Sequence, residues 1–158
     1  MNTSLHTLLE HAEAERDAAL TALRNAEAAA ASAQAQAEQL NTYRTQYQQR
    51  WSMQFRQTGT IELLQCYQGF GQRLDQAITQ QGHVAAQAQN RVAQARALLL
   101  EREQRVAAVK KLIERREQEQ RRVADRREQR STDEAASRAG SASGGREHGV
   151  ARLAASFM

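Results

Sequence analysis

Residues 36–81 read QAEQLNTYRTQYQQRWSMQFRQTGTIELLQCYQGFGQRLDQAITQQ, and this stretch decides the fold. Large apolar side chains recur at helical spacing up to Phe55, a break follows at Gln57-Thr58-Gly59-Thr60, and the pattern then resumes. Thr58-Gly59-Thr60 is the only clear breaker inside a helical pattern that otherwise covers most of the chain. Six of the seven aromatic residues lie between Tyr43 and Phe70. The stretch therefore predicts a helical hairpin with an aromatic-rich closed end.

The predicted fold class is all-α: a long antiparallel two-helix coiled coil with a disordered C-terminal tail. The hairpin domain is expected at 1–139, with helices at 4–56 and 61–136 joined by a turn at 57–60, followed by a flexible Gly/Ser-rich tail at 140–158. The 158 residues include no proline, and alanine is the commonest apolar residue. Because alanine buries little area, we expect a coiled coil rather than a compact multilayer core.

A heptad pattern runs through both arms of the predicted hairpin. Between Leu9 and Trp51, steps of three and four residues alternate, and eleven of the thirteen positions are apolar. The thirteen positions are Leu9, Ala12, Arg16, Ala19, Leu23, Ala26, Ala30, Ala33, Ala37, Leu40, Arg44, Tyr47 and Trp51. The second arm keeps the rhythm at Leu64, Tyr67, Leu74, Ile78, Ala85, Ala88, Val92, Ala95, Leu99, Val106, Val109 and Ile113. These positions are the predicted seam, the face that each helix turns toward the other.

Charge is distributed unevenly along the chain. Residues 1–90 hold 6 basic and 8 acidic residues, whereas residues 91–158 hold 16 basic and 10 acidic residues. Because the second arm is longer, the basic segment 115–138 is expected to extend beyond the paired region. Such a segment suits nucleic acid, an anionic membrane or an acidic protein surface. It is also typical of a solvated helix face, since arginine alternates with glutamate there.

Nothing in the sequence indicates catalysis. There is no glycine-rich phosphate loop, nucleophile elbow or metal-ligand spacing, and His6, His11 and His83 are expected to be surface residues. We therefore predict no enzyme, no cofactor and no metal. Cys66 is the only cysteine, which fits a reducing compartment. The N-terminus does not read as a signal peptide, and no apolar stretch approaches the ~20 residues that span a bilayer.

Two stripes of side chains with the same spacing of four, three and four residues flank the predicted turn. They are Gln36, Leu40, Tyr43 and Tyr47 before the turn, and Phe70, Leu74, Ala77 and Gln81 after it. Antiparallel pairing about Gly59 places position 43 near 74 and position 47 near 70. Two interpretations stay open: the stripes are the seam that closes the hairpin, or they form an exposed patch that binds a partner.

Several segments, in this order and spacing, are similar to those of a known family. They are Leu8-Leu9, Glu13-Ala14-Glu15-Arg16-Asp17-Ala18, Leu40 with Tyr43 and Tyr47, Phe70 with Leu74 to Ile78 and Gln81, Arg126-Arg127-Glu128-Gln129, and Asp133-Glu134-Ala135. Over residues 5–138 the chain resembles the flagellar export protein family FliJ. The resemblance implies an antiparallel coiled coil, similar in shape to the central stalk of rotary ATPases.

The resemblance also implies a function. A FliJ-like protein is a non-enzymatic adaptor of the bacterial flagellar type III export apparatus, needed for flagellum assembly and motility. Its expected partners are the hexameric flagellar export ATPase, the cytosolic linker of the transmembrane export-gate protein and the flagellar export chaperones, with no nucleic acid. Its expected location is cytoplasmic, peripheral at the cytoplasmic face of the plasma membrane at the flagellar base, with membrane association only through partners.

Site residues follow from the resemblance by position. In the family an exposed patch near the closed end contacts the export gate, and its members here are Gln36, Leu40, Tyr43, Tyr47, Phe70, Leu74, Ala77 and Gln81. Where this chain has Gln81 the family commonly has histidine. The contact with the ATPase ring is expected in the basic segment, because this segment overhangs the paired region and carries the charge excess; the residues are Arg121, Arg122, Arg126 and Arg127.

Three other hypotheses remain at this point. A stalk protein of an injection-type type III secretion system would have the same fold, and gene neighbourhood would separate the two. A nucleic-acid-binding coiled coil would use the basic segment 115–138, and its binding would fall steeply with salt. A self-associating structural coiled coil is the third.

Overall fold

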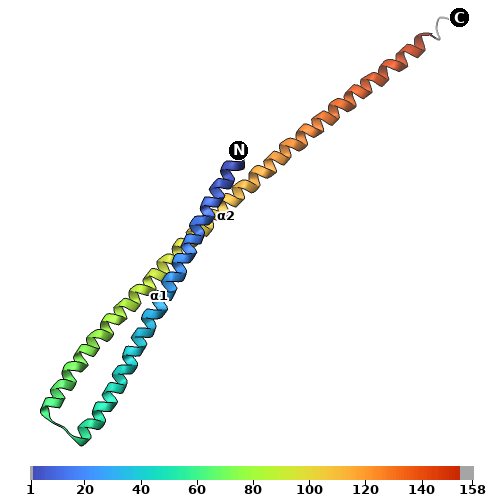
Figure 1. Ribbon diagram of the computed structural model, residues 1–158. Coiled ribbons are helices and arrows are strands. Elements are labelled where there is room, and N and C mark those ends of the chain that lie inside the picture. The colour runs from blue at the N-terminus through green and yellow to red at the C-terminus, as the bar shows by residue number, and fades with distance from the viewer. Residues whose placement is uncertain (1, 154–158) are drawn as a thin grey trace. The chain divides into compact units, whose positions relative to one another are not determined.

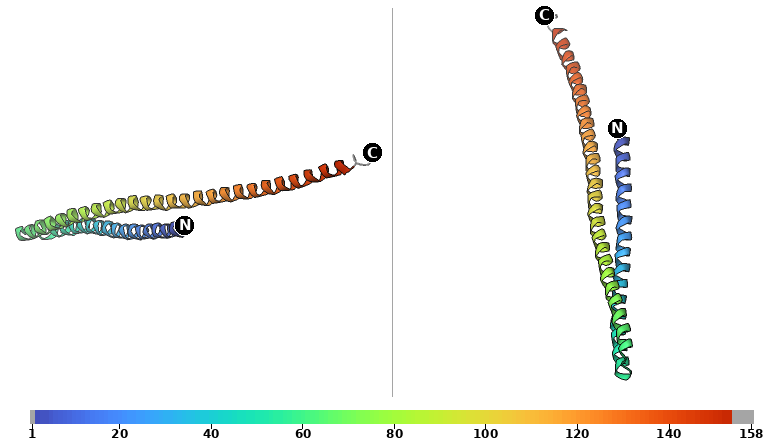
Figure 2. Two further views of the ribbon diagram at one scale, coloured as in Figure 1. Left: turned by 90° about the horizontal axis from the view of Figure 1, so that it is seen from above. Right: turned by 90° about the vertical axis from the view of Figure 1, so that its left-hand side faces the viewer.

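The computed structural model describes residues 2–153, and the side chains of residues 3–144. Helix α1 spans Asn2–Gln57 and helix α2 spans Ile61–Leu153. Within the described residues there is no strand. Figure 1 shows α1, in blue to cyan, antiparallel to the green-to-yellow part of α2, and the two views of Figure 2 show the same pairing. The predicted all-α hairpin is confirmed.

Residues 58–60 connect the two helices. The Thr58 N–H donates to the Gln54 carbonyl oxygen at 2.9 Å, and the Leu64 N–H donates to the Thr60 carbonyl oxygen at 3.1 Å, so the connecting residues make one backbone hydrogen bond to each helix end. Gly59 does not have a positive φ. A Cβ placed on it would lie 3.5 Å from the Phe55 carbonyl oxygen, an ordinary contact. Glycine therefore breaks the helix here through its poor helix propensity rather than through a backbone shape that only glycine adopts.

The chain divides into two compact units, Met1–Val109 and Lys110–Met158. The first unit is the paired hairpin. All thirteen predicted seam positions of α1, from Leu9 to Trp51, are buried or half-buried, as the heptad pattern requires. The centre of the hairpin packs Leu23 and Ala30 of α1 with Val92 of α2, flanked by Ala26, Ala88, Ala95 and Leu99. Small side chains thus let the two helices approach closely.

On α2 the seam begins one residue earlier than predicted. Leu64 is 42% exposed, whereas Leu63 is half-buried. A step of four from Leu63 reaches Tyr67, and another step of four reaches Gly71, so these three residues share one helix face. All of the remaining predicted seam residues, from Tyr67 to Val109, are buried or half-buried. The assignment of Leu64 to the seam is therefore corrected to Leu63.

The pairing is centred on Gly59, as predicted. The Tyr47 and Phe70 ring centroids lie 4.7 Å apart, and the Arg44 Nε lies 2.9 Å from the Asp75 Oδ1. Farther from the turn, Arg96 of α2 reaches Glu27 of α1 at 3.4 Å. Contacts near the turn and at the centre of the unit thus fit one antiparallel pairing of the helices.

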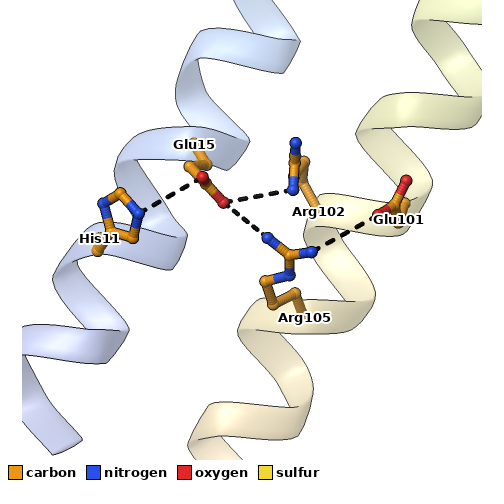
Figure 3. A network of polar contacts seen from close by, with 5 residues as sticks. All are labelled: His11, Glu15, Glu101, Arg102 and Arg105. Carbon is orange, nitrogen blue, oxygen red and sulfur yellow. Dashed lines mark hydrogen bonds and ion pairs between the residues drawn. The ribbon is translucent and has the colours of Figure 1, made fainter.

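A network of charged side chains joins the helices far from the turn (Figure 3). The Glu15 carboxylate of α1 accepts from Arg105 at 3.0 Å and lies 3.4 Å from Arg102, both on α2. His11 and Glu101 extend the network on either side. Because Arg102 occupies a seam step between Leu99 and Val106, Glu15 neutralises a cation that the seam half-buries.

The second unit contains the remainder of α2, and every side chain from residue 114 to residue 144 is exposed. Among these side chains, neither Glu117 with Arg121 nor Glu119 with Arg122 forms an ion pair within 4.0 Å. Helix therefore persists here without an apolar face, through helix-forming residues such as Arg, Glu, Gln and Ala.

The C-terminal bound of α2 differs from the prediction. The sequence predicted a helix end at 136 and a flexible tail over 140–158, whereas α2 continues to Leu153. Two hydroxyls support the backbone in this stretch: Ser141 Oγ donates to the Arg138 carbonyl and Ser143 Oγ to the Gly140 carbonyl, each at 3.0 Å. The part of the predicted tail at 154–158 lies outside the described residues.

We predict that two adjacent leucines differ sharply in their contribution to stability. Leu99 packs against the central cluster, whereas Leu100 is 57% exposed. Leu99→Ala should lower the free energy of unfolding by about 2 kcal/mol because packed area is lost, and Leu100→Ala by less than about 0.5 kcal/mol. Thermal and urea unfolding of both variants measure this. Equal losses would contradict the seam assignment.

Candidate functional site

Aromatic side chains from both helices form a cluster at the closed end of the hairpin. Tyr47 of α1 is its centre, with ring centroids 5.5 Å from Tyr67 and 4.7 Å from Phe70 across the seam. Trp51 and Phe55 continue the cluster toward the turn, each within 5.7 Å of the Tyr67 ring. Burial raises the pKa of the Tyr47 phenol above its ordinary value. The cluster thus belongs to the seam.

Part of this cluster nevertheless faces solvent. Tyr43 is 47% exposed and Phe70 is 40% exposed, while Tyr47, which contacts both rings, is half-buried between them. The three rings form one continuous surface that crosses from α1 to α2. The same residues therefore close the seam and expose aromatic area beside it, and binding of a partner to that area stays a prediction.

The other predicted members of the patch differ in how deeply their side chains are buried. Leu74 is only 7% exposed and belongs to the core, whereas Leu40 and Ala77 are half-buried. Gln36 is exposed. Of the eight residues predicted from the sequence, Leu74 thus offers a partner the least surface.

Gln81 uses its side chain within the hairpin. Its Nε2 donates to the Ala33 carbonyl oxygen at 3.2 Å and to Gln36 Oε1 at 3.1 Å. Both acceptors lie on α1, so the amide ties the helices together where the seam consists of alanines. Gln81 therefore holds Gln36 in place on the surface.

The structure adds a feature that the sequence prediction missed. A surface hollow of about 360 Å³ lies beside the aromatic cluster, lined in part by Tyr67, Gly71 and the Arg44–Asp75 ion pair. Neither Tyr43 nor Phe70 lines it. Gly71 occupies a seam position, and a Cβ on it would meet nothing within 4 Å, so the missing side chain leaves part of this space. In the sequence, the sign of this hollow is Gly71, a glycine at a position where the heptad pattern has apolar side chains.

The four arginines proposed for the ring contact are all exposed, but they do not lie on one face. Arg121 and Arg122 are neighbours on α2, and so are Arg126 and Arg127, so each pair diverges by about 100° around the helix. Arg122 and Arg126 are four residues apart and share a face. Only part of this set can therefore contact one flat surface at the same time.

No group of three or more potential metal ligands occurs among the described residues. None of the helices in the described part of the chain is long and apolar enough to cross a membrane.

Comparison with known families identifies the chain. The family model described as the flagellar FliJ protein matches residues 1–145. The chain belongs to the FliJ family. This FliJ-family protein is a component of flagellar protein export, a type III secretion process, and the family is non-catalytic. Comparisons of this FliJ-family protein with curated proteins and with solved structures found no match.

The depth of Leu74 in this FliJ-family protein leads to a prediction. Leu74→Ala should cost about 3 kcal/mol of unfolding free energy, since a buried leucine leaves a cavity when it is truncated. Leu64→Ala should cost less than about 1 kcal/mol, because Leu64 is already 42% exposed. Chemical denaturation of the two variants compares them. A larger loss of unfolding free energy for Leu64→Ala than for Leu74→Ala would show that Leu64 belongs to the seam, as predicted from the sequence.

Proposed function

We propose that this protein is a stalk-like adaptor of the flagellar type III export apparatus, which links the export ATPase ring to the export gate and to export chaperones. Membership of the FliJ family supports a role in export, and the exposed aromatic surface of the hairpin supports the adaptor role. The proposed location is the cytoplasmic face of the plasma membrane at the flagellar base. Loss of the protein should then impair flagellum assembly and motility.

The single observation that carries the proposal is the exposure of Tyr43 and Phe70 on a folded hairpin. Aromatic rings that pack against their neighbours and still expose a large fraction of their area are suited to act as interface anchors, since little ordering is needed on binding. We propose that Tyr43 and Phe70 bind the cytosolic linker of the gate protein. Tyr47, Leu40 and Ala77 complete the surface at half-buried depth.

Leu74 and Gln81 support this surface rather than supply most of it. Leu74 is buried in the seam one helical turn after Phe70, and the Gln81 amide holds Gln36 by a hydrogen bond of 3.1 Å. Glutamine at this position thus replaces a family histidine with a side chain that is already bonded within the hairpin. We propose that, of the hydrogen-bonded pair Gln36 and Gln81, Gln36 is the residue exposed to a partner.

The first prediction of the proposal concerns the gate contact. Tyr43→Ala and Phe70→Ala should each weaken binding to the cytosolic region of the export gate by about 2 kcal/mol or more, roughly thirtyfold in Kd, because an aromatic anchor is removed. Isothermal titration calorimetry with the purified proteins measures the change.

Met53→Ala is the matched control, since Met53 is 73% exposed and lies outside the patch. It should leave gate binding unchanged. Each aromatic variant should also lose less unfolding free energy than Leu74→Ala. Intact gate binding together with a large loss of melting temperature would show that the rings only hold the hairpin together.

The second prediction concerns the ATPase ring. Replacing Arg121, Arg122, Arg126 and Arg127 with glutamine should slow association with the ring more at low salt than at high salt, since exposed charges steer encounters and salt screens them. Stopped-flow or surface-binding kinetics at two ionic strengths provide the measurement, after a pull-down has shown that the export ATPase is recovered.

A charge-matched control replaces four other exposed arginines with glutamine: Arg24, Arg50, Arg56 and Arg91. This variant has the same net charge as the first variant but keeps all the arginines of the basic segment. If both variants slowed association equally, net charge rather than the basic segment would govern the encounter.

A further inference from the structure

In the second unit, basic and acidic side chains lie on opposite sides of the helix, and no sequence motif indicated this arrangement. Between residues 110 and 130, α2 is a regular helix whose side chains are all exposed apart from Ile113. At about 100° per residue, seven basic residues fall within roughly 160° of its circumference. This basic face comprises Lys111, Arg115, Arg116, Arg122, Arg126, Arg127 and Arg130, with Glu119 as its one acidic residue. The face has a net charge of +6.

The opposite side of the same segment is acidic. It holds Glu114, Glu117, Asp125 and Glu128 with Lys110 and Arg121, a net charge of −2. Among the side chains that the structure describes, no ion pair within 4.0 Å involves a residue between 110 and 133. The cations of the basic face are therefore not neutralised by contacts within the helix.

Two apolar side chains lie within the basic face. Leu112 is 43% exposed and Val123 is 42% exposed, and at 100° per residue both fall in the sector that the seven cations occupy. Their eleven-residue separation is close to three full helical turns, which places one above the other. The face thus combines a dense positive charge with two exposed aliphatic groups.

We infer that this basic face binds the surface of an anionic phospholipid bilayer. A sector of roughly 160° that extends for about 28 Å between Lys111 and Arg130 fits a plane. Arginine and lysine would contact lipid phosphates, and Leu112 and Val123 would enter the headgroup region between them. The acidic side would remain in water.

Other anionic partners fit the face less well. A nucleic-acid groove surrounds a helix, so phosphates would approach the acidic side as well as the basic one. An acidic partner helix contacts a narrower strip than the sector occupied here. The basic face shares Arg122, Arg126 and Arg127 with the ring contact proposed above, but it excludes Arg121, which lies on the acidic side, and the inference names a different partner.

The test uses the full chain and flotation with vesicles of phosphatidylcholine and phosphatidylglycerol at 0.15 M salt. Arg115→Gln with Arg126→Gln should weaken partition into these vesicles about tenfold to thirtyfold, because each cation near the surface contributes separately. Lys110→Gln with Arg121→Gln removes the same charge from the acidic side. That control should change partition less than about threefold, since those cations stand farther from the lipid and are screened.

A second measurement does not depend on removing charge. With Cys66→Ser as background, an environment-sensitive fluorophore on Leu112→Cys should shift to shorter wavelength when vesicles are added, and one on Asp125→Cys should not. Circular dichroism checks that all variants keep their helix content. Absence of flotation with anionic vesicles, equal binding to phosphatidylcholine alone, or equal loss in both charge variants would overturn the proposal. Binding of the basic face to an acidic protein without vesicle binding would also overturn it.

Discussion

Burial along one seam is the interaction on which the hairpin depends. The seam consists largely of alanine with a few leucines and valines, and the most deeply buried of them include Ala12, Ala30, Val92 and Val106. Each contact removes little apolar area from water, so stability is distributed over many layers along the helices. Small side chains nevertheless permit close approach. Pairing is therefore sustained by the length of the seam, and it is reinforced at the closed end by larger aromatic side chains.

Polar side chains interrupt this seam, and three of their contacts across it restrict how the helices can pair. Arg102 meets Glu15 far from the turn, the Gln81 amide reaches the Ala33 carbonyl in the alanine-rich section, and Arg44 pairs with Asp75 beside the aromatic cluster. Alanine faces are nearly alike, so they distinguish poorly between alternative alignments. A half-buried charge or amide is satisfied in only one alignment. These contacts thus give a weakly specified seam a unique register.

The aromatic cluster shows how a structural contact can also provide a binding surface. Tyr47 lies between rings of both helices, and its own burial supports Tyr43 and Phe70 in positions where much of their area remains exposed. In a two-helix unit no third layer covers the flanks of the seam. Large residues at the edge of the seam are therefore partly exposed by geometry. In the proposed adaptor this surface is available without a change in the fold.

The sequence by itself determined the helical class, the turn at Gly59 and the pairing of residue 47 with residue 70, because a short turn at the breaker brings together residues at similar distances on either side of it. It could not choose between Leu63 and Leu64, since both fit a helical step to Tyr67. It also did not give the C-terminal end of α2, where no apolar pattern marks the helix. Only the tertiary structure decided that Leu74 is core while Phe70 is exposed, and that Gly71 leaves a hollow. The exposed fraction of a side chain depends on how the other helix covers it. Residue spacing along one helix does not contain that information.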